Sequence, residues 1–291
     1  MIEVSNCVVC DGEIREIKRA LVAPFLAKRI WNRKAFCVDL VQCQACGFTF
    51  YNPRLDDDEL RRLYANYRTD EYQRMRYAFE PWYTRKFNTE LASEASYKVR
   101  RAKLTPILHQ YLADRKIKRV LDHGGDRGDL IVGLLDGAEG FVYDISGIPP
   151  ATGVTAVSDP AACKADLIIN SNVLEHVGFP RILVSDILHA SPSGGLVFLE
   201  VPCETPLGVS RIARRVAQIG LTSLTRPTVA PQVIRPSSLY MLHEHINYFT
   251  EASLTALMRS SGGKIIASGF YPLSATAGNS GMVWCIGSRQ E

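Results

Sequence analysis

Four cysteines form two closely spaced pairs near the beginning of the sequence. Cys7 and Cys10 are separated by two residues, and so are Cys43 and Cys46. This spacing lets both thiolates of a pair turn onto one ion, and two such turns complete a tetrahedral four-sulfur site. Unrelated core cysteines or a redox pair are the alternatives, and two pairs in one short segment argue against both. The spacing predicts a structural Zn²⁺ site, because four protein ligands leave no position for water or substrate.

A second chemical signal is the segment RVLDHGGDRGDL, which begins at Arg119. A short apolar strand, an acid, glycines and a helix start follow one another as in a nucleotide-binding turn. A dinucleotide fingerprint needs three glycines, because pyrophosphate approaches the backbone there. After Gly124, however, Asp126 and Asp129 occupy the next two glycine positions and would set carboxylates against phosphate. The pattern disfavours NAD and ATP and suits S-adenosylmethionine, which has no phosphate and carries a cationic sulfonium.

These residues need elements that position them, and the hydrophobic pattern predicts a sheet whose strands alternate with helices. Such alternation argues for a parallel sheet covered on both faces, with ligands outside the carboxyl ends of the strands. The predicted strands are Arg119–Leu121, Gly140–Asp144, Val154–Val157, Leu167–Asn170, Leu196–Val201, Lys264–Gly269 and Gly281–Ile286. The predicted helices in this part are Asp129–Leu135, Pro180–Ala190 and Thr250–Ser260.

The stretch VLDHGGDRG resembles the first motif of class I S-adenosylmethionine-dependent methyltransferases, an acid followed by G-x-G-x-G. The acid is Asp122 and the outer glycines are Gly124 and Gly128, whereas Asp126 stands in place of the middle glycine. Gly125, one position earlier, supplies backbone freedom. The resemblance implies that the acid and the three glycines hold S-adenosylmethionine. It also implies an α/β, Rossmann-like fold with a seven-stranded, mostly parallel sheet.

Three further segments resemble later motifs of the same family. GFVYDIS ends a strand with Asp144, where the family places an acid that accepts both ribose hydroxyls, a task that suits the two oxygens of a carboxylate. ADLIINSNVLEHV resembles the fourth-strand motif and includes Asn170, and ASPSGGLVFLEVP resembles the following turn and fifth strand. Asp159, after a short predicted strand, is the candidate for the adenine amine. Helix-capping acids of a generic doubly wound fold are the alternative, and four motifs in the correct order argue against it.

The resemblance extends across the chain to zinc-ribbon methyltransferases of bacterial sugar and polysaccharide pathways, which include the TDP-sugar C-methyltransferases. Members begin with two CxxC pairs and a GF.F.NPR stretch, continue into the methyltransferase core, and carry an EH…YF segment. The corresponding parts here are Cys7–Arg54, Arg119–Val201 and HEHINYFT. We therefore expect a zinc ribbon at 1–55, a helical connection at 56–115 and a methyltransferase domain at 116–291, in which 206–248 is a substrate-binding insertion.

Methyl transfer to an alcohol or to a sugar carbon acid requires a base, and His or Glu suits this role near neutral pH. His176 follows the fourth predicted strand, where substrate should lie; a helix-start residue bonded to the backbone is the alternative. In the sugar C-methyltransferases a Tyr-His-Glu-His stretch lines the substrate site. Glu244 and His245 are retained here, whereas Leu242 replaces the tyrosine and leaves O-methylation open beside C-methylation. A second metal at His243 and His245 is a lesser alternative without a further spaced ligand.

Residues 206–238 contain five arginines and no acid. In a helix, Arg211, Arg214 and Arg215 would lie on a different face from the apolar residues that begin with Val209. Arginine forks suit phosphates, so this segment is predicted to face an anionic group such as a nucleotide diphosphate or a lipid-linked glycan phosphate. A solvated surface helix and a basic helix that rests on a membrane surface are the alternatives.

The composition of the 291 residues is that of a globular protein, with 46% hydrophobic and 22% charged residues. No apolar run reaches the roughly 18 residues that span a bilayer, and the N-terminus lacks the pattern of a secretory signal, so we expect a cytoplasmic protein. A net charge of +4 is too slight to argue for nucleic acid. The main hypothesis is a methyltransferase acting on a small sugar or glycan precursor. The alternatives are a nucleic-acid methyltransferase that binds through its zinc head and a non-catalytic binding module.

Overall fold

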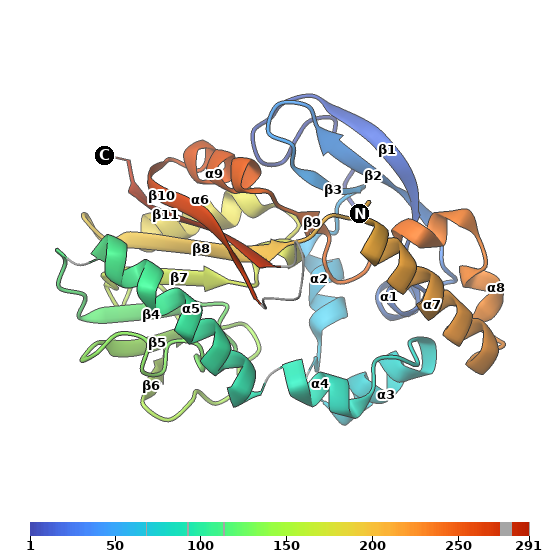
Figure 1. The fold of residues 1–291 in the computed structure, drawn as a ribbon, viewed down its shortest axis with the longest axis horizontal. Coiled ribbons are helices and arrows are strands. Elements are labelled where there is room, and N and C mark those ends of the chain that lie inside the picture. The colour runs from blue at the N-terminus through green and yellow to red at the C-terminus, as the bar shows by residue number, and fades with distance from the viewer. Residues whose placement is uncertain (68, 92, 113, 274–280, 291) are drawn as a thin grey trace.

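The computed structural model describes residues 1–67, 69–91, 93–112, 114–273 and 281–290. Its larger sheet has seven strands in the order β10-β11-β8-β7-β4-β5-β6 (Figure 1). The strands are β4 (Arg119–His123), β5 (Glu139–Tyr143), β6 (Val154–Ala156), β7 (Leu167–Ser171), β8 (Leu196–Cys203), β10 (Gly263–Pro272) and β11 (Gly281–Arg289). Strands β8, β7, β4, β5 and β6 pair in parallel, whereas β11 pairs antiparallel with both β8 and β10. The prediction of an α/β, Rossmann-like fold with a seven-stranded, mostly parallel sheet is confirmed.

Helices cover both faces of this sheet. Successive residues of a strand point to opposite sides, and the buried strands carry apolar side chains on both. Along β8, Val197 belongs to a buried cluster with side chains of α6 (Pro180–Ala190) and α9 (Glu251–Ser260). The next residue, Phe198, belongs to a cluster on the other face, where α5 (Glu94–Leu112) packs (Figure 1). The carboxyl ends of the parallel strands are left at one edge of this three-layered arrangement.

The predicted helix Asp129–Leu135 is wrong. The structure has a run of turns there, with bonds that span three residues, such as the one from the Leu134 N–H to the Ile131 carbonyl (3.1 Å). Gly133 and Gly137 have φ angles of 67° and 72°, which a right-handed helix does not allow. The turns leave a cavity of about 210 Å³ against strands β4, β5 and β6.

The smaller sheet is antiparallel and carries the cysteine pairs at one end. Its strand order is β1-β2-β3-β9. The strands are β1 (Ile14–Leu21), β2 (Cys37–Cys43), β3 (Thr49–Asn52) and β9 (Asn247–Tyr248), and α1 (Pro24–Trp31) connects the first two. Strand β9 begins two residues after His245, so the C-terminal half of the chain completes the N-terminal sheet.

The remaining helices form a body beside the carboxyl edge of the larger sheet (Figure 1). They are α2 (Asp57–Tyr64), α3 (Asp70–Phe79), α4 (Arg85–Leu91), α7 (Val209–Thr225), α8 (Ala230–Val233) and the 3₁₀ turns η1 (Leu174–His176) and η2 (Pro236–Tyr240). Asp56 starts α2 with both bonds of a capping box. One buried cluster joins side chains of α1, α2, α3, α8 and the smaller sheet. In the part of the chain that the structure describes, no helix is long and apolar enough to cross a membrane.

Helix α7 presents different faces from those predicted. Arg215 is buried and Arg211 is half-buried, whereas Val209 and Val216 are exposed. The reason is that the guanidinium groups find partners inside the protein: Arg211 donates to the carboxylate of Glu204 at 2.7 Å. The predicted apolar and arginine faces therefore do not correspond to the buried and exposed sides of this helix.

Candidate active site

The glycine turn after β4 is shaped by the acid that precedes it. A Cβ on Gly125 would lie 2.1 Å from Cγ of Asp122, so position 125 requires glycine. Gly124 has a φ of +77°, and a Cβ there would lie 2.6 Å from a methyl group of Val173. Gly128 also has positive φ, at +78°. The backbone thus closes over Asp122, and positions 124 and 125 leave no room for a Cβ.

Asp122 is buried without a full set of partners. It is 1% exposed, and its Oδ2 finds no hydrogen-bond partner among the described residues. Burial raises the pKa of the carboxyl to about 7, although Arg100 opposes the shift. Arg100 reaches this edge from α5 and donates to Glu200 of β8 at 3.0 Å. Because an unpaired buried acid is costly, Asp122 fits a site that receives a positively charged group and does not fit a phosphate site.

Asp144 lies just beyond β5 and is bonded to the glycine turn. Its Oδ2 accepts from the N–H of Asp126 at 2.8 Å, and its Oδ1 accepts from the N–H of Ser146 at 2.7 Å. Asp126 takes a φ of 57°, the left-handed conformation that glycine adopts most easily. Each oxygen of the Asp144 carboxylate keeps a lone pair, so the group can still accept two further hydroxyl donors.

Asn170 and Asp159 have different surroundings. Asn170 of β7 is fully buried and donates to the carbonyl of His123 at 3.0 Å, which ties the ends of β7 and β4 together. Its Oδ1 has no partner in the described chain, as is true of Asp122 Oδ2. Asp159 lies in an exposed turn after β6, where it accepts from the N–H of Ala161 at 2.9 Å. The structure therefore brings Asn170 to the edge that carries Asp122 and places Asp159 on the surface beyond β6.

His176 ends the turn η1, directly beyond β7. Its Nδ1 lies 3.0 Å from the backbone carbonyl of Glu244 and 2.9 Å from the hydroxyl of Tyr64. Because a carbonyl oxygen can only accept, Nδ1 carries the proton of this bond and Nε2 keeps its lone pair. Burial lowers the pKa of the imidazole to about 4, so the ring is neutral at pH 7.

His245 lies beside His176, with 4.9 Å between the ring centroids. Its Nδ1 is 3.0 Å from Oε2 of Glu204, and Arg211 donates to the same oxygen at 2.7 Å. Burial lowers the pKa of His245, but the bond to Glu204 outweighs this effect and the net pKa is raised. Glu204 is not recognisable from the sequence, because its histidine partner lies 41 positions later and only the fold brings the two together.

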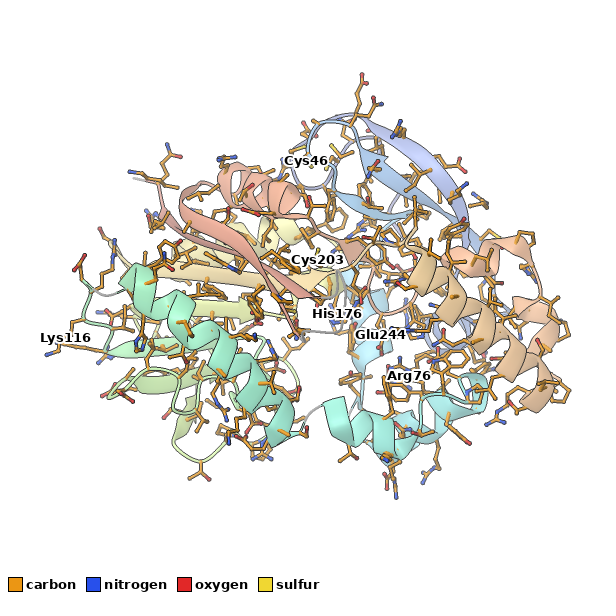
Figure 2. All side chains as sticks on the ribbon, viewed as in Figure 1. Cys46, Arg76, Lys116, His176, Cys203 and Glu244 are labelled. Carbon is orange, nitrogen blue, oxygen red and sulfur yellow. The ribbon has the colours of Figure 1, made fainter. Side chains whose placement is uncertain are left out.

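The carboxylate of Glu244 is directed toward α3. Its Oε1 accepts from Arg76 at 2.6 Å and from Tyr72 at 3.0 Å. Burial raises the pKa of this carboxyl, but the attraction of Arg76 outweighs burial and the net pKa is lowered. Figure 2 shows His176, Glu244 and Arg76 in succession between the larger sheet and α3. Glu244 thus contacts His176 through its backbone carbonyl while its side chain forms an ion pair.

One buried arginine holds the loops of both histidines. Arg54 is 1% exposed and donates to the carbonyl of Gly178 at 2.8 Å and to Oδ1 of Asn247 at 2.6 Å. Asn247 in turn donates to the carbonyl of Leu174 at 2.6 Å. These bonds connect the loop that carries His176 to the strand that follows His245. The last residue of the GF.F.NPR stretch therefore positions both imidazoles.

The four paired cysteines converge at the end of the smaller sheet, where Figure 2 labels Cys46. The sulfur atoms of Cys10 and Cys43 lie 3.5 Å apart, and those of Cys7 and Cys46 lie 3.8 Å apart. A tetrahedral ion with bonds of about 2.3 Å places its sulfurs roughly 3.8 Å apart, whereas a disulfide needs about 2.05 Å. The hydrogen bond with Cys46 lowers the pKa of the Cys7 thiol, which favours the thiolate form that ligates a metal.

An open, mostly parallel sheet with a glycine turn and polar groups at its carboxyl edge defines an α/β protein that binds its ligand at that edge. A family model described as a methyltransferase domain matches residues 97–268, more than half of the chain. The chain therefore belongs to this family of methyltransferases. Family and fold together confirm the predicted enzyme class, a class I S-adenosylmethionine-dependent methyltransferase.

One solved structure of low sequence identity has the same fold. The 1,6-didemethyltoxoflavin-N1-methyltransferase of Burkholderia thailandensis is 16% identical with a TM-score of 0.53, over 88% of this chain and 96% of that one. The N-methyltransferase NodS of Bradyrhizobium japonicum is 13% identical, over 69% and 91% of the two chains, with a TM-score of 0.42. Both structures contain S-adenosylhomocysteine. A sequence comparison with curated proteins finds no match.

Proposed function

We propose that the protein transfers a methyl group from S-adenosylmethionine to an oxygen or a carbon atom of a sugar or glycan precursor. The observation that carries this proposal is Asp122, a buried acid covered by a turn in which Gly125 leaves no room for a Cβ. Such a turn admits a cationic ligand close to the backbone and disfavours the phosphates of other nucleotide cofactors. His176 lies beyond β7, the strand next to β4, and His245 lies beside it.

The residues around the turn fit S-adenosylmethionine. Asp122 would pair with a positive group of its methionine portion, and Asp144 would accept the ribose hydroxyls with its two remaining lone pairs. The unpartnered Oδ1 of Asn170 offers a further acceptor at the same edge. When bound, the cofactor supplies an electrophilic methyl group. The proposed cofactor-binding residues are Asp122, Gly124, Gly125, Gly128, Asp144, Asp159 and Asn170.

The acceptor must be aligned with the methyl group and must lose a proton as it reacts. We assign its activation to His176 and His245, whose side chains are 27% and 31% exposed and thus reachable from solvent. Nε2 of His176 is available for this task, because the Glu244 carbonyl holds the proton of its ring on Nδ1. Glu244 serves the reaction by holding His176, while its own carboxylate is bound to Arg76.

The polar character of this region supports a hydroxyl-rich acceptor. The hydroxyl of Tyr64 lies within hydrogen-bond reach of His176, the carboxylate of Glu204 lies within reach of His245, and the two imidazoles are neighbours. Such sets of polar groups recognise neutral polyols through several directed bonds. Recognition of phosphate by α7 is not part of the proposal. Arg211 is bound to Glu204 inside the protein, and Arg214 is exposed.

We further propose that Cys7, Cys10, Cys43 and Cys46 hold one structural Zn²⁺. The spacing of their sulfurs agrees with tetrahedral coordination. Val9, Cys43 and Phe48 belong to the same buried cluster as side chains of α9, so the ion would stabilise a segment that packs on the methyltransferase sheet. Four protein ligands leave the ion no catalytic position.

Two measurements test the proposal. Calorimetry of the full chain with S-adenosylmethionine should show one site with micromolar or tighter affinity, and absence of binding would refute the assignment of the turn. Incubation with isotope-labelled cofactor and pools of nucleotide sugars, followed by mass spectrometry, should then yield a labelled sugar. Label transferred to RNA or DNA and to no sugar would support the nucleic-acid alternative.

A further inference from the structure

Three side chains that could ligate a metal meet at the histidine pair. Glu175, His176 and His245 each offer one ligand atom, and these atoms all lie within 4.8 Å of one another. Oε1 of Glu175 is 3.8 Å from Nε2 of His176. Ligands around one cation with bonds of about 2.1 Å lie roughly 3 to 4 Å apart, so small side-chain rotations bring these atoms to bonding distance.

The outer contacts of both histidines favour coordination through Nε2. Nδ1 of His176 faces the carbonyl of Glu244 at 3.0 Å, and Nδ1 of His245 faces the carboxylate of Glu204 at 3.0 Å. Metal-ligating histidines donate their other N–H to a carbonyl or a carboxylate in this way, which orients the ring and sets its tautomer. Both rings therefore have an Nε2 lone pair that is held in a defined direction.

Glu175 supplies the third donor and an independent observation. The residue is 2% exposed, and its Oε2 has no hydrogen-bond partner in the described part of the chain. A carboxylate buried without partners is costly unless a cation compensates it. Two guanidinium groups that act electrostatically on this cluster are paired elsewhere, since Arg211 binds Glu204 and Arg100 binds Glu200.

We infer that Glu175, His176 and His245 bind one divalent transition-metal cation, such as Mn²⁺, Fe²⁺ or Co²⁺. Two imidazoles and one carboxylate form a ligand set that suits these ions and leaves other coordination positions open. This inference rests on the proposed function and deepens it: with the ion bound, the two histidines would act on the acceptor through the metal, in place of Nε2 of His176 as a direct base. The open positions would take oxygen atoms of the acceptor, favour the loss of their protons and hold them beside the cofactor. The alternative of a metal at His243 and His245 is a different site, since Nε2 of His243 bonds to Glu80.

The inference is tested by titration with Mn²⁺, in which binding is measured as the loss of the electron paramagnetic resonance signal of the free ion. Mn²⁺ is chosen because carboxylate and imidazole ligands accept it, whereas four thiolates favour zinc. The full chain, kept with its cysteine-bound metal, should bind one Mn²⁺. Glu175→Gln should weaken this binding at least about tenfold, and His109→Gln, which alters an exposed histidine of α5, should leave it unchanged.

Glu204→Gln provides a second variant in case Glu175→Gln does not fold. It leaves all three ligands in place and weakens the acceptor of His245, so Mn²⁺ affinity should fall about 10- to 100-fold. S-adenosylmethionine binding, measured on the same samples, reports whether each variant is folded. Absence of Mn²⁺ binding, or Mn²⁺ binding that both variants retain, overturns the metal site. In either case the proposed function stands if the cofactor still binds. Mn²⁺ binding without cofactor binding would refute the proposed function and support the metal site.

Discussion

Replacement of Asp122 by asparagine should stabilise the protein and abolish most of its cofactor affinity. Burial raises the pKa of this carboxyl from 3.8 to about 7, so the charged form costs free energy in the folded state. The difference between these two pKa values corresponds to roughly 4 kcal/mol at pH values above 7. Asparagine has the same shape without the charge, and the free energy of unfolding should therefore rise by up to this amount. For a chain of this length, that is an increase in Tm of up to roughly 8 °C.

The sign of the pH dependence makes this prediction specific. Because the pKa of this carboxyl is raised on folding, the protein becomes less stable as pH rises from 3.8 through about 7. The stability gain of the variant should therefore grow by about 1.4 kcal/mol per pH unit between pH 4 and pH 7 and level off above. Thermal unfolding of both proteins at pH 5 and pH 8 measures this difference.

The same variant, although more stable, should bind the cofactor more weakly. The loss of one charge-assisted contact costs about 1.5 to 3 kcal/mol, so calorimetry should show S-adenosylmethionine affinity reduced roughly 10- to 100-fold. A variant that gains equal stability at pH 5 and pH 8, or that binds the cofactor as well as the wild type, would show that Asp122 is not an unpaired carboxyl held for a cationic ligand.

Two further substitutions test the turn and the cysteine site, each with a matched control. Gly125→Ala should lower stability by about 1 to 3 kcal/mol and weaken cofactor binding, because its Cβ would overlap the Asp122 carboxyl; Gly220→Ala, with open space inside α7, should be neutral or stabilising by up to about 1 kcal/mol. Cys43→Ser should remove bound zinc, measured by elemental analysis, and lower Tm, whereas Cys37→Ser should keep the ion; unchanged zinc content in Cys43→Ser would refute the four-sulfur site.

The sequence predicted the layered sheet and the position of the glycine turn because these depend on local patterns. Apolar strands, glycines and turn residues recur at short spacing, and the predicted helix Thr250–Ser260 corresponds to α9 together with its capping residue Thr250. The error at Asp129–Leu135 has a local cause as well. Leucine and isoleucine at helical spacing favoured a helix, but Gly133 and Gly137 adopt conformations that end one.

The contacts of the site could not be predicted in the same way, because they join distant parts of the chain. Glu204 follows β8 and meets His245 from 41 positions later, and the Gly178 carbonyl that accepts from Arg54 lies 124 positions after it. Glu175 stands beside His176 in the sequence, yet its burial without a partner is a property of the folded chain. A helix-face argument likewise could not reveal that Arg215 points inward.

The pairing of β3 with β9 has a consequence for engineering. Two residues from the far end of the chain complete the cysteine-bearing sheet, and Arg54 reaches back from that sheet to the loop behind the histidines. The head cannot be exchanged by itself, since a transplanted one would have to pair with the edge strand β9 of the other protein and would bring a foreign residue in place of Arg54. Chimaeras between relatives would have to swap both segments together to keep the chemistry aligned.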